Sequence, residues 1–230
     1  MPLFFYDYWY VILVVPMIIF SLIMNANVKG TYSKYKTVRN RSGITGGEAA
    51  RRILLENGIT DVRIEVCGGE LTDHYNPRTN VVSLSADVFN STSVAAVGIA
   101  AHEVGHVCQH YSDYAPIKIR NAVLPVANIG SSLSIPLIII GIFLSFKPLV
   151  MAGVIAFAAV VLFQLVTLPV EFNASSRAMK SLVSCGILSA DETSGTRKVL
   201  SAAAMTYVAA LALSLAQLLR LILIARNNRD

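Results

Sequence analysis

The chain of 230 residues contains four long apolar stretches that carry almost no charge. They cover residues 3–24, 124–146, 149–170 and 199–225. Each stretch is close to the roughly 20 residues that a helix needs to cross a lipid bilayer. Only 14% of all residues are charged, against about a quarter in an ordinary soluble domain. The pattern therefore predicts a mostly α-helical membrane protein with about four transmembrane helices.

The connections between these stretches favour uncleaved, closely paired helices. The first stretch begins with aromatic residues and Asp7 rather than with positive charge, which argues against a cleaved signal peptide. Only Lys147 and Pro148 separate the second stretch from the third, so residues 124–170 are predicted to form a tight transmembrane hairpin. The last stretch is apolar apart from Gln217 and Arg220.

The net charge of +5 is explained by residues that flank the apolar stretches. Basic residues are enriched on the cytoplasmic side of membrane proteins, so residues 29–123 and 171–198 are predicted to be cytoplasmic. Arg226 and Arg229 do not fit this orientation, which leaves open whether the last helix crosses. The sequence predicts a multi-pass protein of the plasma membrane with the lipid bilayer as a partner. The sequence has no basic stripe interleaved with aromatic residues, so nucleic acid is not expected as a partner.

Residues 29–115 are less apolar and predict a small α+β unit. Helices are expected at residues 49–57 and from Ser91 to about His110. Apolar and polar residues alternate over residues 62–66, which predicts a half-buried strand. Residues 81–85 form a second short strand candidate.

Residues 102–106 have the sequence His-Glu-Val-Gly-His, a pattern typical of zinc peptidases. Residues four apart lie on one face of a helix, so His102 and His106 can bind one zinc ion. Glu103 lies one step around the helix, where it can activate a water without being a ligand. The alternative is a buried helix whose histidines serve packing and hydrogen bonding.

A catalytic zinc site needs a third protein ligand. Glu171 is the strongest candidate, because it is the only acidic residue between Asp113 and Asp191 and follows the third apolar stretch. It could instead lie at a solvated helix end or pair with Arg177. With His102, His106 and Glu171 as ligands, one Zn²⁺ per chain is predicted.

Three further residues are weaker candidates for catalytic roles. His74 could stabilise an oxyanion or contact substrate, or Asp73 and His74 could form a turn fixed by local hydrogen bonds. Tyr207 could face the site from the last helix, although tyrosines in membrane helices are more often structural. Arg177 could stabilise developing negative charge or mark the cytoplasmic end of a helix.

Three segments together resemble one known family. Residues 73–78, 100–106 and 171–175 are similar to the bacterial neutral zinc metallopeptidases, which are YugP-like membrane proteins. The resemblance implies a membrane zinc peptidase with a small zincin-like cytoplasmic unit. The layout is similar, more distantly, to HtpX heat-shock proteases and CAAX prenyl endopeptidases, whose pattern has an acidic residue where this chain has Ser175. The resemblance also suggests that residues 81–85 form an edge strand that pairs with the extended backbone of a substrate.

These observations predict a zinc-dependent endopeptidase of the gluzincin type that acts on peptide or membrane-protein substrates at the cytoplasmic surface. The alternative is a catalytically inactive membrane scaffold or adaptor that keeps the zinc for stability. Glu103 favours the enzyme, because a purely structural site has no need of it. A transporter is disfavoured, since the first three apolar stretches have no charged residue at mid-span.

Overall fold

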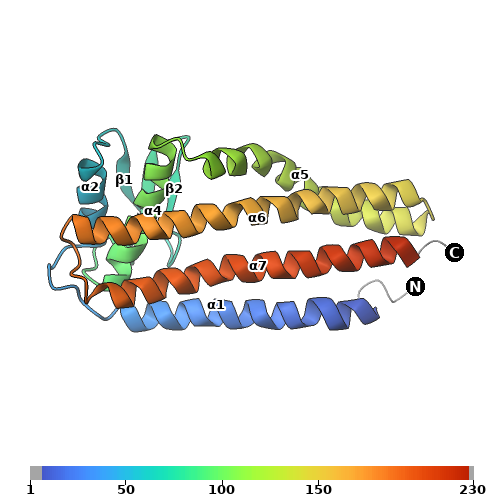
Figure 1. Cartoon of the computed structure of the whole chain (residues 1–230), viewed down its shortest axis with the longest axis horizontal. Coiled ribbons are helices and arrows are strands. Elements are labelled where there is room, and N and C mark those ends of the chain that lie inside the picture. Colours follow the sequence, from blue (N-terminus) through green and yellow to red (C-terminus); the bar gives the residue numbers. More distant parts are fainter. Residues whose placement is uncertain (1–6, 228–230) are drawn as a thin grey trace. The chain divides into compact units, whose positions relative to one another are not determined.

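The computed structural model describes residues 7–227 and is mostly helical (Figure 1). The elements in chain order are η1 (Tyr10–Val14), α1 (Val15–Tyr35), α2 (Gly46–Glu56), β1 (Arg63–Cys67), β2 (His74–Asn76), β3 (Val81–Ser85), α3 (Ala86–Phe89), α4 (Val94–Tyr111), α5 (Ala115–Phe143), α6 (Lys147–Ser184) and α7 (Thr193–Asn227). Within residues 7–227, four helical segments are long and apolar enough to cross a membrane, and there is one small sheet. The predicted fold class is therefore confirmed.

The helices differ in extent from the apolar stretches. Helix α5 begins at Ala115, before the stretch that starts at residue 124, and α6 continues past residue 170 to Ser184. Lys147 and Pro148 open α6 rather than forming the turn, because proline is well tolerated in the first turn of a helix. The predicted start of the first stretch at residue 3, the aromatic residues at positions 4–6, and Arg229 lie outside the described residues.

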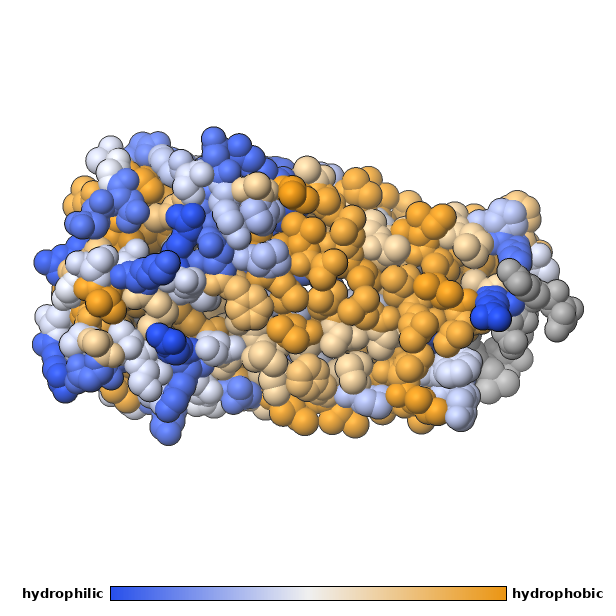
Figure 2. All heavy atoms as spheres, in the orientation of Figure 1, coloured by the Kyte–Doolittle hydropathy of each residue, from blue (hydrophilic) through white to orange (hydrophobic). Residues whose placement is uncertain are grey.

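The chain divides into two compact units. In its described part, the first unit comprises residues 7–25, 115–169 and 205–227, most of which belong to the long apolar helices. Glycines allow α5 and α6 to approach closely: a side chain at Gly130 would meet the carbonyl oxygen of Ala156, and one at Gly153 that of Ser134. Large apolar side chains cover the surface of these helices (Figure 2). This surface suits contact with lipid.

A partly buried ion pair accounts for Arg220 in the last apolar stretch. The side chain of Arg220 is only 3% exposed, and its Nη2 and Nε donate to Oδ2 of Asp7 at 2.8 and 3.0 Å. Its guanidinium also lies over the ring of Tyr10, 5.1 Å from the centroid. Charged groups within membrane helices are tolerated when they are paired in this way.

The second unit comprises residues 26–114 and 170–204 and contains a three-stranded sheet in the order β1-β3-β2. Strand β3 pairs in parallel with β1 and antiparallel with β2. The expectation that residues 81–85 form an edge strand is therefore wrong: β3 is central, and its backbone pairs on both sides. The edge strands are β1 and β2. Strand β2 has only three residues and was not predicted, because the sequence around Pro77 is rich in turn-forming residues.

Helix α4 runs through the apolar core of this unit. The Ser93 side chain accepts from the backbone N–H of Ala96 and so caps the start of α4. The neighbouring α2 begins with a capping box in which Thr45 and Glu48 satisfy each other's backbone N–H groups. Side chains from α2, β3, α4 and α6 make up the core, among them Ile53, Leu84, Val97, Val104 and Leu182. Cys108 is also buried there.

Candidate metal centre

His102 and His106 lie one turn apart on α4. Their rings are 4.8 Å apart between centroids and nearly perpendicular, with an interplanar angle of 87°. Both side chains are largely buried, with 16% of His102 and 13% of His106 exposed. The two imidazoles therefore lie side by side on one face of α4.

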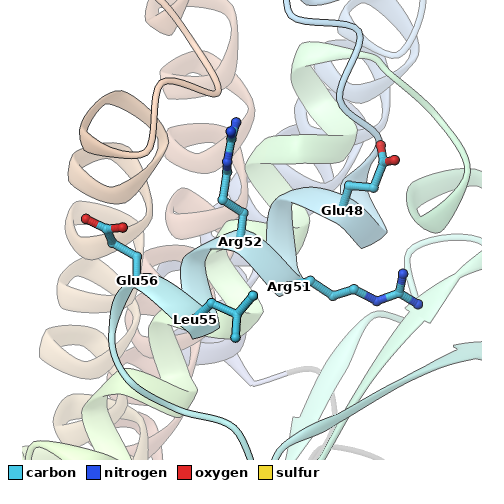
Figure 3. A pocket seen from close by; sticks show the side chains of 5 residues that line it. All are labelled: Glu48, Arg51, Arg52, Leu55 and Glu56. Carbon is cyan, nitrogen blue, oxygen red and sulfur yellow. The ribbon is translucent and has the colours of Figure 1, made fainter.

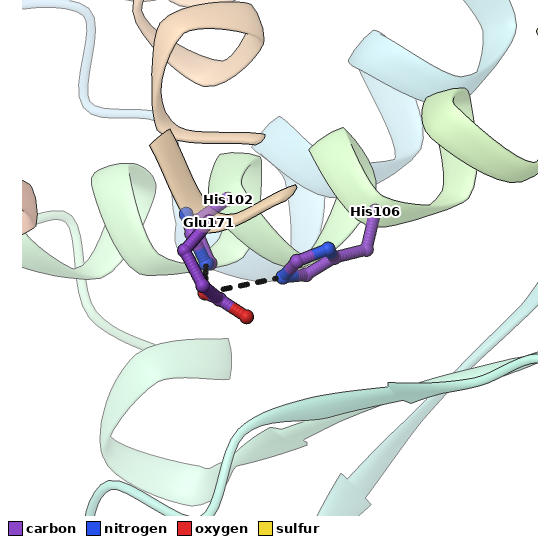
Figure 4. Close-up of side chains that lie close together, drawn as sticks. All are labelled: His102, His106 and Glu171. Atoms are coloured by element: carbon purple, nitrogen blue, oxygen red, sulfur yellow. Dashed lines mark ion pairs between the residues drawn. The ribbon is translucent and has the colours of Figure 1, made fainter. Parts of the chain in front are cut away.

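Glu171 comes from α6 and points at both imidazoles (Figure 4). Its Oε2 lies 3.3 Å from Nε2 of His102 and 3.7 Å from Nε2 of His106. These separations are close to the roughly 3.4 Å expected between two ligand atoms that each lie about 2.1 Å from a tetrahedral zinc. One ligand atom from each of the three residues falls within 4.8 Å of the others.

The carboxylate of Glu171 supports a cation at this place. Its Oε2 is buried and accepts no hydrogen bond, although it faces two imidazole nitrogens. A buried oxygen without a hydrogen-bond donor is costly, and a cation between it and the imidazoles would remove that cost. Two imidazoles and one carboxylate are also the donors that catalytic zinc sites use. The residues therefore fit a zinc ion.

Helices α4 and α6 approach each other closely beside the site. A Cβ atom at Gly105 would lie 2.7 Å from the carbonyl oxygen of Ala174 and 3.2 Å from its Cα. Only glycine permits this separation, because the obstructing atoms belong to the backbone. The close contact lets the Glu171 side chain reach the two histidines.

We expect Gly105→Ala to weaken metal binding. The added methyl group must push α6 away from α4, at a cost of about 1–3 kcal/mol in overpacking. The displacement separates Glu171 from the imidazoles, so zinc affinity should fall together with thermal stability. Titration with a chelating dye and thermal unfolding measure the two effects.

Gly30→Ala is the matched control, because Gly30 lies in α1 with nothing within 4 Å of an added Cβ. Alanine is the better helix former, so this variant should retain its zinc affinity and unfold at the same or a higher temperature. Equal zinc affinity in Gly105→Ala and the native protein would contradict the expectation.

The second ring nitrogen of each histidine also has a partner. Nδ1 of His102 lies 3.1 Å from the hydroxyl of Ser175, and Nδ1 of His106 lies 3.0 Å from Oε1 of Gln109. The sequence pattern alone did not indicate a role for Gln109. The available signal was a polar residue three positions after His106 on a largely apolar helix.

The carboxylates of Glu171 and Glu103 both act on the His106 imidazole. Burial acts to lower the pKa of His106, but the carboxylate of Glu171 and the charge of Glu103 outweigh it, and the pKa is raised. Glu103 is 9% exposed and therefore also lies largely out of water. Two carboxylates near two imidazoles favour a bound cation over none.

The structure places the weaker candidates as follows. His74 is exposed on β2, with Nδ1 2.8 Å from the carbonyl oxygen of Thr72. Arg177 donates from Nε to Oδ1 of Asn173 at 2.8 Å, and Tyr207 is 39% exposed on α7. The catalytic roles considered for His74, Arg177 and Tyr207 stay predictions.

A shallow pocket on α2 is lined mainly by charged, exposed side chains, unlike the buried metal centre (Figure 3). Its lining side chains are Glu48, Arg51, Arg52, Leu55 and Glu56. All are exposed, and opposite charges follow one another at helical spacing of three or four residues. Such an arrangement is typical of a solvated helix face.

The helical membrane architecture, together with two histidines and a glutamate that converge, defines a class: membrane proteins with a metallopeptidase-like site. Residues 10–226 match the family model described as "Putative neutral zinc metallopeptidase", and the chain belongs to this family. It is 48% identical over 203 residues to a protein of Bacillus subtilis (strain 168) named "Putative membrane protease YugP", covering 88% of this chain and 90% of that one. No solved structure matches.

Proposed function

We propose that the protein is a zinc-dependent endopeptidase with one zinc ion held by His102, His106 and Glu171. The observation that carries this proposal is the buried Oε2 of Glu171, which accepts no hydrogen bond and faces Nε2 of both histidines. Membership of a zinc metallopeptidase family supports the identity of the metal and the class of reaction.

Glu103 is the proposed general base. Zinc, when bound, acts as a Lewis acid that lowers the pKa of a water toward neutrality. Glu103 follows His102 on α4 and accepts the proton as the water attacks the peptide carbonyl carbon. The carboxylic acid then returns this proton to the leaving amine, which completes hydrolysis and restores the carboxylate.

The proposed substrates are peptides or membrane proteins cut at the cytoplasmic surface of the plasma membrane. Four apolar helices support membrane association, and the basic residues that follow the first helix support a cytoplasmic location for the site. A zinc-stabilised scaffold is the competing function, but it gives no reason for a buried Glu103 beside the ligands.

Purified full-length protein in detergent provides the test. We expect metal analysis to find one zinc per chain, and a panel of casein and membrane proteins to be cleaved. A chelator should stop cleavage, and added zinc should restore it, because the proposed reaction needs the metal. Cleavage that continues after complete zinc removal would contradict the mechanism. Full zinc loading without cleavage of any substrate would favour the scaffold.

A further inference from the structure

Gln109 is a buried amide that joins the two helices bearing the proposed ligands. Its side chain is 0% exposed. Nε2 donates to the carbonyl oxygen of Val170 at 2.7 Å and to Oδ1 of Asn173 at 3.1 Å, while Oε1 lies 3.0 Å from Nδ1 of His106. Both amide hydrogens and the oxygen are therefore used, as a buried amide requires.

Arg177 fixes the direction of these hydrogen bonds. Its guanidinium can only donate, so Oδ1 of Asn173, 2.8 Å from Nε of Arg177, is an acceptor. The Gln109 atom that faces this oxygen and the carbonyl of Val170 must then be the NH2 group. The other end of the amide is consequently an oxygen, which accepts from His106.

The oxygen of Gln109 determines which nitrogen of His106 carries hydrogen. Because Oε1 only accepts, Nδ1 must carry the hydrogen in the neutral ring. Nε2 then has a free lone pair, and this is the atom that lies 3.7 Å from Oε2 of Glu171. His102 differs, since the hydroxyl of Ser175 can either donate to its Nδ1 or accept from it.

We propose that Gln109, oriented by Asn173 and Arg177, is a positioning residue that holds His106 in the Nδ1–H tautomer and so presents Nε2 to the metal. The proposal rests on the zinc site of the proposed function but not on peptide cleavage. It also gives Asn173 and Arg177 a defined task at the site, which is to orient the amide of Gln109.

Nitrogen NMR of histidine-labelled, zinc-free, full-length protein tests the tautomer directly. At a pH where the imidazoles are neutral, His106 should show a protonated Nδ1 and an unprotonated Nε2. In Gln109→Met, which keeps the length of the side chain but cannot accept this hydrogen bond, the Nε2–H form should become populated. His102 is the internal control, and a His106→Asn variant assigns the signal. An Nε2–H tautomer at His106 in the native protein would overturn the proposal.

Zinc affinity provides the second measurement. Loss of a residue that orients a metal ligand lowers metal affinity by about 10- to 100-fold, and we expect this for Gln109→Met. Asn173→Leu should also weaken binding, whereas Asn173→Asp keeps an acceptor oxygen and should bind zinc as the native protein does. Unchanged affinity in Gln109→Met would overturn the proposal. Normal zinc binding and the expected tautomer without any cleavage would reject only the peptidase.

Discussion

Glu103→Gln is expected to reduce peptide cleavage strongly while leaving zinc in place. Glutamine has nearly the same size as glutamate but cannot take the proton from the attacking water. General acid–base catalysis contributes about 10²- to 10⁴-fold, so kcat/KM should fall by that factor. Glu103 is not among the three residues that converge on the proposed metal position, and zinc content should therefore stay at one per chain. Peptide cleavage assays and metal analysis on the same preparation measure both quantities.

Glu56→Gln is the matched control, because Glu56 is exposed on α2 and undergoes the same chemical change. It should cleave substrate as the native protein does. Native-like cleavage by Glu103→Gln would remove the glutamate from the mechanism. Zinc loss in this variant would instead assign Glu103 a role in metal binding.

The part of the site that the sequence predicted depends on local geometry. The spacing of His102 and His106 requires only that the segment be helical, and the capping serine and apolar residues before it indicate a helix. Glu171 was proposed because it is an isolated acidic residue at the end of an apolar stretch. The structure brings it to the histidines, whereas the alternative partner Arg177 donates to Asn173.

The parts that the sequence missed depend on how distant segments approach one another. Gln109 could be seen as a polar residue on an apolar helix, but its contact with Val170 and Asn173 exists only because α4 and α6 pack closely at Gly105. The order of the sheet is equally non-local. Residues 81–85 have the pattern of a short strand, but their central position depends on pairing with β1 on one side and β2 on the other. Pairing order is not encoded in the alternation of a single strand.

Glu171→Ala is expected to remove most of the zinc from the protein. Zinc binding contributes about 10–16 kcal/mol in small zinc sites, and if three ligands share it, loss of one lowers affinity on the order of 10³-fold. Cleavage should fall in parallel at limiting zinc. Competition with a chelating dye measures the affinity of the native protein and the variant.

The stability of the zinc-free protein shows whether Glu171 is a metal ligand or a purely structural residue. Oε2 of Glu171 is buried without a hydrogen bond, so removing the carboxylate from the zinc-free protein should cost little stability. Native protein should gain thermal stability from added zinc, because a ligand that binds only the folded state stabilises it, and Glu171→Ala should lose this gain. Glu56→Ala, on the exposed face of α2, should keep it. If Glu171→Ala instead destabilised the zinc-free protein and bound zinc normally, Glu171 would be a structural partner of the histidines, and the metal would need another third ligand.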